Sequence, residues 1–368
     1  MDAAEYEARG LYDPSAPGAA DHLEFLNWLV DQGISIDLIV DAHERDHLTG
    51  LAGDVALRSA ERFTCAEVAE KTGLSVEDVQ RLALTIGRPV SDPEERAFTA
   101  ADVDAFQMFG AAAALFGEQP LLQFVRVLGS SLGRVADAAV SLFLADVETP
   151  MDQSDAGELA LAKANLEAIE TAKWLPGLME VVFLALMEGA IARNRAARAE
   201  SGSKVTVFVA VGFVDLVGFT PLSQRIPATE LGSVVDEFEA AAYDIVASNG
   251  GRVVKLIGDE VMFVALDAAS ASEIALALVE RFGRETSVTP RGGLAVGEIL
   301  TRGGDYYGPV VNVASRIADL AVPNEILVTD ELRERAQKEA APLAFDPAGR
   351  RLLKGFDEPL ELFALRRP

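Results

Sequence analysis

The hydrophobic pattern changes near residue 200, and this change limits the fold more than any other feature. From Asp21 to about Arg198, apolar residues recur at three- and four-residue spacing, as in HLEFLNWLVDQGISIDLIVDAH, which is typical of amphipathic helices. After residue 200, strand-like runs alternate with helical ones, which indicates an α/β or α+β sandwich. The sequence therefore predicts an all-α domain at 1–188, a linker helix at 189–203 and an α+β domain at 204–368.

Strands and helices of the second domain are expected in alternation. Its first strand is predicted at Lys204–Asp215, and RVVKLIGDEVMFVAL, RGGLAVGEILTR and EILVTD also have strand character. Helical periodicity predicts helices between them, at Thr229–Ser248, Ser270–Arg284 and Gly308–Leu320. The linker before them begins as a basic amphipathic helix and ends in the flexible break Ser201-Gly202-Ser203.

The chain is strongly acidic, with 58 acidic and 32 basic residues and a formal net charge of −26. The excess is concentrated before residue 201, where 34 residues are acidic and 15 are basic. Such a surface repels nucleic acid and anionic lipid, so we expect no nucleic-acid partner.

Cysteine usage and the N-terminus favour a cytoplasmic protein. The single cysteine, Cys65, excludes an intrachain disulfide and a four-cysteine zinc site. The first residues, MDAAEYEARG, are acidic where a signal peptide is basic. The most apolar stretch, Trp174–Ala192, contains Glu180, Glu188 and Pro176, so we expect no membrane span.

Two carboxylates follow strand-like runs in the second domain. Asp215, in FVDLVGFT, precedes a turn at Gly218, Phe219 and Thr220 whose backbone N–H groups would face phosphate oxygens. Asp259, in VVKLIGDEVMFV, lies in a Gly-Asp hairpin turn. Each alone has an ordinary interpretation, as a cap or a turn residue. On neighbouring strands, the two would hold a pair of magnesium ions about 3.5–4 Å apart for phosphoryl transfer.

A third segment, DYYGPVVNVASR, also carries candidate site residues. Asn312 and Arg316 are four residues apart, so on a helix they share one face and place an amide beside a guanidinium. The structural alternative is a surface salt bridge of Arg316.

Together these segments resemble the class III nucleotide cyclases. The resemblance covers roughly Lys204 to Leu365 and includes the late segment LLKGFDEPLELFAL. It implies a ferredoxin-like catalytic domain with an antiparallel-rich sheet and flanking helices. The helical half is similar, more loosely, to the N-terminal regulatory part of some actinobacterial adenylate cyclases, which implies control of the catalytic domain.

The resemblance also implies a metal site and phosphate contacts. Asp215 and Asp259 match the metal-binding aspartates, Leu216 is assigned to the same site, and the cofactors would be two Mg²⁺ or Mn²⁺ ions. The residues that would contact the substrate phosphates are Phe219, Thr220 and Lys354.

Lys255 and Asp305 match the purine-selecting pair of the family. Adenine presents an acceptor at N1 and a donor at its 6-amino group, so a lysine and an aspartate suit ATP better than GTP. Asn312 matches the residue that orients the ribose, and Arg316 the one that stabilises the transition state. The expected reaction is attack of the ribose 3′-hydroxyl on the α-phosphorus, which yields cyclic AMP and pyrophosphate.

The family builds its site from two subunits. One supplies Asp215 and Asp259, and the other supplies the base, ribose and transition-state residues. All of them occur in this one chain, so we expect a homodimer with two equivalent sites.

Three other functions compete with an adenylate cyclase. A guanylate cyclase differs only in the base, and a nucleotide-sensing, DNA-binding regulator would bind without turnover. Diguanylate cyclases share the Gly258-Asp259-Glu260 hairpin but lack the DYYGPVVNVASR segment.

Two motifs in the helical half suggest other chemistry. His43–His47, HERDH, matches the zinc-protease pattern, but the third ligand of one protease class would fall on Gly53, so a solvated helix face is favoured. Phe63–Leu82 fits a helix-turn-helix with Gly73 in the turn. Its recognition helix holds Glu77 and Asp78 and, among cations, only Arg81, which favours protein packing over DNA binding.

The helical domain is expected to inhibit the catalytic domain and to release it at mildly acidic pH. Residues 1–200 carry 34 acidic and 15 basic residues, a net charge of −19, and this repulsion falls on acidification. His43 and His47 would gain charge in the same pH range. A small ligand or lipid in this domain is left open.

Overall fold

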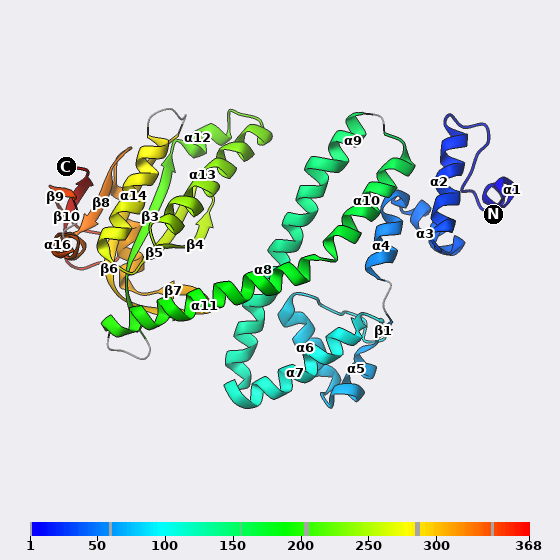
Figure 1. Ribbon diagram of the computed structural model, residues 1–368, viewed down its shortest axis with the longest axis horizontal. Coiled ribbons are helices and arrows are strands. Elements are labelled where there is room, and N and C mark those ends of the chain that lie inside the picture. Colours follow the sequence, from blue (N-terminus) through cyan, green and yellow to red (C-terminus); the bar gives the residue numbers. More distant parts are fainter. Residues whose placement is uncertain (1, 59–60, 155, 202–205, 284–287, 340–341) are drawn as a thin grey trace. The chain divides into compact units, whose positions relative to one another are not determined.

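The computed structural model describes residues 2–58, 61–154, 156–201, 206–283, 288–339 and 342–368 (Figure 1). The chain divides into two compact units, Met1–Leu184 and Ala185–Pro368.

The first unit is almost entirely helical, as its 3.6-residue periodicity predicts. Its elements in chain order are α1 (Ala3–Ala8), α2 (Ala19–Asp31), α3 (Ile36–Glu44), a 3₁₀ turn (Leu48–Gly50), α4 (Leu51–Leu57), β1 (Arg62–Phe63), α5 (Cys65–Thr72), α6 (Val76–Ile86), β2 (Phe98–Thr99), α7 (Ala100–Phe116), α8 (Glu118–Phe143), a π-helical turn (Leu144–Glu148), α9 (Thr149–Gln153), α10 (Glu158–Ala172) and α11 (Leu175–Ser201). The helical pattern does not predict the short antiparallel ladder between β1 and β2.

Two apolar clusters hold this unit together. The first joins α1, α2, α3 and α4 to α10 around Tyr6, Phe25 and Leu29, which are fully buried. The second joins α5, α6, α7 and the start of α8 around Val68, Val79 and Phe98. Burial of these side chains supplies the main driving force for folding.

Two helices joined by a turn, α5 and α6, occupy the segment predicted as a helix-turn-helix at Phe63–Leu82. α5 ends at Thr72, and Gly73 follows it with a φ of 75°, the left-handed conformation that glycine adopts without strain. Thr64 and Ser75 cap α5 and α6 through their side-chain oxygens.

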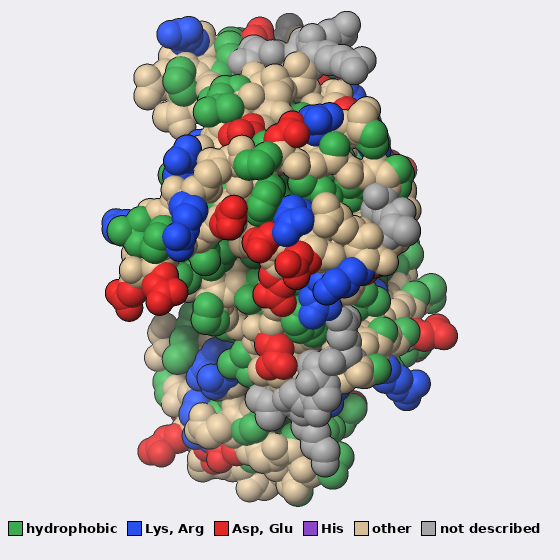
Figure 2. All heavy atoms as spheres, turned by 90° about the vertical axis from the view of Figure 1, so that its left-hand side faces the viewer, with side chains coloured by type: hydrophobic (Ala, Val, Ile, Leu, Met, Phe, Trp, Pro, Cys, Tyr) green, Lys and Arg blue, Asp and Glu red, His purple; other side chains and the backbone are tan. Residues whose placement is uncertain are grey.

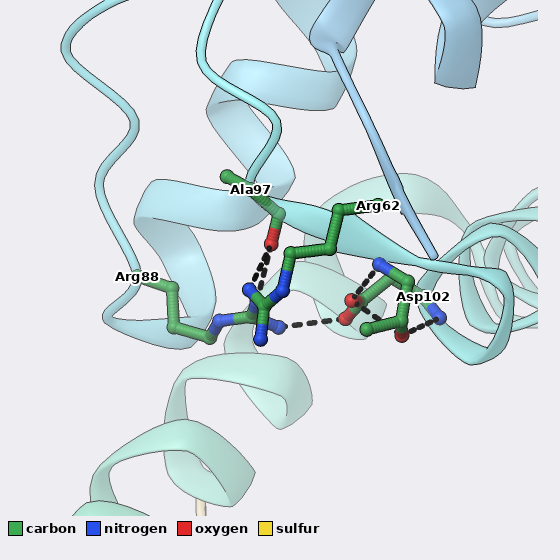
Figure 3. A network of polar contacts seen from close by, with 5 residues as sticks. Arg62, Arg88, Ala97 and Asp102 are labelled. Carbon is green, nitrogen blue, oxygen red and sulfur yellow. Dashed lines mark hydrogen bonds and ion pairs between the residues drawn. The ribbon is translucent and has the colours of Figure 1, made fainter. Parts of the chain in front are cut away.

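The arginines around this motif bond within the protein. Figure 3 shows Arg62 and Arg88 converging on the carbonyl of Ala97, at 3.3 and 3.2 Å, while Arg88 also pairs with Asp102 at 2.6 Å. Arg81, on the recognition helix, pairs with carboxylates of Asp78 and Glu118. Guanidinium groups used in this way do not form the cationic surface that DNA phosphates need.

The HERDH motif does not form a zinc-protease helix. α3 ends at Glu44, so His43 lies in its last turn and His47 lies beyond it. His47 Nε2 is 3.9 Å from a carboxylate oxygen of Asp54. The two imidazoles therefore do not share the helix face that this motif requires.

α8 and α11 expose many large apolar side chains. By length and composition alone, the helical stretches Glu118–Met151 and Glu158–Ala199 are long enough to cross a membrane, a test that core helices of soluble proteins also pass. The most apolar windows of both are unburied among the described residues. The expectation of no membrane span stays a prediction. The exposed side chains include Phe124, Val135, Val140, Leu142, Trp174, Val181, Phe183 and Leu186.

The second unit is a mixed sheet with helices on both faces. Its elements in chain order are β3 (Thr206–Val217), α12 (Phe219–Ser223), α13 (Ala228–Ser248), β4 (Arg252–Ile257), β5 (Glu260–Ala265), α14 (Ala268–Phe282), β6 (Thr289–Arg302), β7 (Asp305–Tyr307), α15 (Pro309–Leu320), β8 (Ile326–Thr329), α16 (Asp330–Lys338), β9 (Ala344–Arg351) and β10 (Leu360–Arg366). The strand order is β4-β5-β3-β6-β8-β10-β9, with β7 paired to β6. All these pairs are antiparallel except β6 with β8.

Each face of the sheet has its own core. α13, α14 and α16 cover one face around Phe238, Ile274 and Phe263 (Figure 1). α15 and the end of α11 cover the other, around Ile317 and Met262. These layers confirm the predicted α+β fold, an antiparallel-rich sheet with flanking helices.

α11 continues as a helix to Ser201, and Gly202 and Ser203 of the predicted break lie outside the described residues. On the face seen in Figure 2, basic and acidic side chains are interspersed. The described residues of that face therefore form no continuous basic patch for nucleic acid.

Candidate active site

Asp215 lies near the end of β3 and forms an ion pair with a residue on the next strand. Arg291, at the start of β6, donates to its Oδ2 from Nε at 3.2 Å and from Nη2 at 3.0 Å. The two residues are direct partners in the β3–β6 register. Arg291 Nη1 also donates to the carbonyl of Asp319 at 2.9 Å, so the guanidinium links the sheet to the end of α15.

The second predicted metal ligand lies beside the first. Asp259 follows Gly258, which has a φ of 65°, in the tight turn between β4 and β5. The Leu216 N–H donates to the carbonyl of Asp259 at 3.2 Å and so ties the turn to β3. Burial raises the pKa of Asp259, and the negative charge of Asp215 raises it further. The structure therefore brings the two predicted aspartates together.

A third carboxylate belongs to the same cluster. Glu260 lies opposite Asp215 in the β3–β5 register, so Glu260, Asp215 and Arg291 form a row across three strands. Burial, followed by the charges of Asp215, Asp319 and Asp259, raises the pKa of Glu260 to about 7.

The predicted phosphate turn begins a short helix. Gly218, with φ 94°, precedes α12, and the backbone of Phe219 and Thr220 forms its first turn. The Phe219 side chain packs on the apolar core, so only its backbone can face an anion. The Leu216 side chain is also buried, which leaves its backbone carbonyl as the only group that could bind a metal.

Lys255 and Asp305, the predicted base-reading pair, are in direct contact. Lys255 Nζ, on β4, donates to Asp305 Oδ2, on β7, at 2.7 Å. The N–H of Tyr306 donates to the other oxygen at 2.8 Å. Burial acts to raise the pKa of Asp305, but these hydrogen bonds and the charge of Lys255 lower it on balance. The carboxylate therefore stays ionised and ready to accept a hydrogen bond.

Asn312 and Arg316 lie on α15, as predicted, and both are exposed. Arg316 Nη1 is 3.4 Å from Asp319 Oδ2. α15 begins four residues after Asp305 and ends where Arg291 bonds its last carbonyls. The helix therefore runs from the Lys255–Asp305 pair towards the cluster around Asp215, and the two predicted residues lie between them.

Lys354 lies in the turn between β9 and β10 and is exposed. Leu353 and Phe356 pack in the same apolar cluster as Met262, on the face of the sheet that α15 covers. The turn is thus anchored on that face, while the role of Lys354 stays a prediction.

Arg291 and Glu260 were not predicted to act in the site. Each belongs to a strand-like run with no feature of its own, and only the register places it beside Asp215. The Gly258-Asp259-Glu260 triplet indicates a hairpin of the kind found in diguanylate cyclases, which assigns no role in this site to Glu260. A basic residue at the start of RGGLAVGEILTR is the one signal that pointed to Arg291.

The donor set fits divalent ions that bind together with a nucleotide. Among the described residues, no group of three or more histidine, cysteine or acidic side chains is placed to hold a metal by itself. Mg²⁺ is typically bound by one or two carboxylates plus substrate phosphates. Asp215 and Asp259 supply such a pair.

Two family models match this chain. The adenylate cyclase regulatory domain matches residues 4–189, and the adenylate and guanylate cyclase catalytic domain matches residues 200–366. A solved structure, the adenylyl cyclase CyaB from P. aeruginosa, aligns with 44% of this chain and 95% of its own, at 23% identity and a TM-score of 0.41.

Several relatives are similar to this chain over most of its length. An uncharacterized protein of Mycobacterium tuberculosis is 34% identical over 98% of this chain and 93% of its own length. An adenylate cyclase of Streptomyces coelicolor is 34% identical over 76% of this chain and 72% of its own length. A pH-sensitive adenylate cyclase of Mycobacterium tuberculosis is 31% identical over 97% of this chain and 91% of its own length. The chain belongs to the class III adenylate cyclase family, in the group that carries an N-terminal regulatory domain.

Proposed function

We propose that this enzyme converts ATP into 3′,5′-cyclic AMP and pyrophosphate. The observation that carries the proposal is the 2.7 Å contact between Lys255 and Asp305. The lysine can donate to adenine N1, and the aspartate can accept from the 6-amino group. With guanine, both groups would have to change their targets, and a polar group left unpaired in the site costs binding energy. The names of the adenylate cyclase relatives support the same substrate.

Asp215 and Asp259 would hold two Mg²⁺ or Mn²⁺ ions together with the triphosphate. When bound, such ions lower the pKa of the ribose 3′-hydroxyl and neutralise the phosphates. Asn312 would orient the ribose, so that the 3′-oxygen lies in line with the α-phosphorus. Arg316 would meet the charge that develops on the α-phosphoryl group. Lys354 and the backbone at Phe219 and Thr220 would bind the remaining phosphates.

We propose that the working enzyme is a homodimer. Lys255 lies on β4 and Asp259 in the turn after it, four residues further on, so one chain carries a base-reading residue and a metal-binding residue on the same hairpin. The proposed roles assign these two residues to opposite ends of one nucleotide, which a site shared between two chains allows. Two chains related by a two-fold axis would place one cluster of each beside the other. The exposed apolar faces of α8 and α11 are of the kind that obligate dimers bury.

The test of the activity is direct. Purified full-length protein is incubated with Mn²⁺ and either ATP or GTP, and the cyclic products are separated and quantified. We expect cyclic AMP as the main product. An excess of cyclic GMP would favour the guanylate cyclase alternative, and no turnover of either nucleotide would refute the proposal.

We further propose that the first unit inhibits the second and that mild acidification relieves the inhibition. The support is the acidic excess of residues 1–200 and the resemblance to a relative named as pH-sensitive. The test compares the full chain with residues 200–368 between pH 5.5 and 8. A truncated protein no more active than the full chain at pH 8 would refute inhibition. Equal pH profiles would show that the first unit is not the sensor.

A further inference from the structure

The hairpin that carries Asp305 has little support of its own. β6 and β7 are joined by Gly303 and Gly304, whose φ values of 61° and 79° define a two-residue turn. β7 has three residues, so its ladder supplies only a few hydrogen bonds. A hairpin this short is marginally stable, so contacts from elsewhere must fix the position of Asp305.

Arg252, on β4, makes those contacts on both sides of Asp305. Its Nη2 donates to the carbonyl of Gly304 at 3.2 Å, and its Nη1 donates to the hydroxyl of Tyr306 at 3.2 Å. Its guanidinium carbon lies 5.7 Å from the centre of the Tyr306 ring, within the range of a cation–π contact. The planar guanidinium group of arginine has several N–H donors and can bind two acceptors at once, which the ammonium group of lysine does less well.

A β-bulge brings Arg252 and Lys255 to the same side of the sheet. Residues three apart on a regular strand point to opposite faces. Here the register shifts between Val253 and Lys255, so Arg252 lies opposite Val264 and Lys255 lies opposite Met262. Val264 and Met262 are two residues apart and belong to the same core cluster. If β4 were regularly pleated over this three-residue spacing, Arg252 and Lys255 would lie on opposite faces and could not both reach the hairpin.

We propose that Arg252 is a positioning residue that holds the β6–β7 hairpin so that Asp305 meets both Lys255 and the purine. This inference rests on the proposed function, because it concerns the base-reading half of that site. Arg252 would act without touching the nucleotide: it fixes the backbone on either side of Asp305, and its charge also helps to keep that carboxylate ionised.

A small cavity beside this contact fits a positioning role. It has a volume of about 160 Å³ and is lined by Arg252, Asp305 and Tyr306 together with Arg193 and Ala197 from the end of α11. This free volume beside the hairpin would allow the hairpin to shift if the Arg252 contacts were lost. The tight packing expected of a protein interior would not allow this.

The test uses full-length Arg252→Gln, Arg252→Lys, Tyr306→Phe and the Arg252→Gln/Tyr306→Phe double variant. The matched control is Arg350→Gln, which removes an exposed arginine that also donates to a backbone carbonyl, that of Pro359. We expect Arg252→Gln to raise the KM for ATP about tenfold and to reduce the preference for ATP over GTP about tenfold, with kcat changed less than about threefold.

The other variants divide the effect among the contacts. Arg252→Lys should retain part of the purine preference, because its ammonium group keeps the charge and can still donate to one of the two acceptors. Tyr306→Phe should give a smaller loss than Arg252→Gln and add little to it in the double variant, because both remove the same contact. The proposal is overturned if Arg252→Gln leaves KM and preference within about twofold of wild type, or if Arg350→Gln has the same effect.

Two readouts do not depend on turnover. Hydrogen exchange at residues 300–307 should be faster in Arg252→Gln and unchanged in Arg350→Gln. Calorimetry with ATP and GTP analogues that carry an α,β-methylene group should show the same loss of purine preference. If wild-type protein forms no cyclic nucleotide, the proposed function fails, and these two measurements still decide the role of Arg252. Unchanged exchange in the Arg252→Gln hairpin would overturn the positioning role.

Discussion

The guanidinium of Arg291 lies 3.0 Å from the Asp215 carboxylate, one of the two aspartates proposed to bind metal. Both side chains are about three-quarters buried, with exposed fractions of 25% and 22%. A buried carboxylate beside two further acids, Asp259 and Glu260, needs a positive charge nearby. Arg291 supplies that charge, so a bound metal ion would have to share Asp215 with it or replace it.

Replacing Arg291 should expose this competition. In Arg291→Met we expect the metal-free protein to melt several degrees lower, because the acidic cluster loses its cation. The rise in melting temperature on adding Mn²⁺ should be larger than in wild type, since the ion no longer competes with a guanidinium. Thermal denaturation with and without Mn²⁺ measures the melting temperature of the metal-free protein and its rise on adding the ion. Equal metal-induced shifts in the two proteins would contradict the competition.

Mixing two inactive variants should restore activity if the site is shared between subunits. Asp215→Ala and Arg316→Ala each disable a different half-site, so a mixed dimer keeps one intact site of two. With random exchange, half of the dimers are mixed, and the recovered rate should be about a quarter of wild type. Cyclic AMP formation after co-refolding measures it. No recovery, once subunit exchange is verified with tagged chains, would place both residues in one half-site.

The preference for ATP over GTP should change when Lys255 and Asp305 are replaced. Replacing Lys255 by Glu and Asp305 by Cys should lower ATP turnover at least about 100-fold, because neither side chain then matches the adenine edge. A gain in GTP turnover is expected to be small, since the surrounding contacts are built for the native pair. Steady-state kinetics with both nucleotides provides the measurement. ATP turnover close to that of wild type would show that these residues do not read the base.

The contact in Figure 3 predicts a pH-dependent stability of the first unit. Burial acts to raise the pKa of Asp102, but hydrogen bonds from Thr99 and Arg88 lower it on balance. A lowered pKa stabilises the folded state above the unfolded value of about 3.9, and the stabilisation is lost as the pH falls through the folded value. Asp102→Asn should therefore cost about 1–2 kcal/mol at pH 7 and much less near pH 3.

Urea unfolding of the full chain, followed by helical circular dichroism at both pH values, measures this difference. Asp104→Asn is the matched control, because Asp104 is exposed on the same helix. Equal losses for the two variants at pH 7, or an undiminished loss for Asp102→Asn near pH 3, would contradict the argument.

Much of the second unit could be predicted because its elements have strong local signals. The strand ending near Asp215, the Gly258-Asp259 turn and the helix bearing Asn312 all occur where the residue pattern placed them. Arg291 could not be placed in the same way. Its importance comes from standing opposite Asp215, and the register between two strands 76 residues apart is a tertiary property that no local pattern encodes.

The long helices α8 and α11 show a second limit of prediction from the sequence. Periodicity predicted that α8 and α11 would be helical, but it could not say what their apolar faces contact. In the described chain those faces are exposed, as at Val140 and Phe183. An apolar stripe has the same sequence pattern whether it packs on its own domain, a second copy or another partner.

The bulge in β4 makes the spacing of two basic residues depend on the geometry of the strand. Val254 is the residue without a register partner, so Arg252 and Lys255 share a face although they are three residues apart. Substitutions at Val254 that keep an apolar residue should be tolerated. Among relatives, a chain with the same three-residue spacing needs a bulge at this place, whereas a chain with one residue fewer can keep both basic side chains on one face of a regular strand.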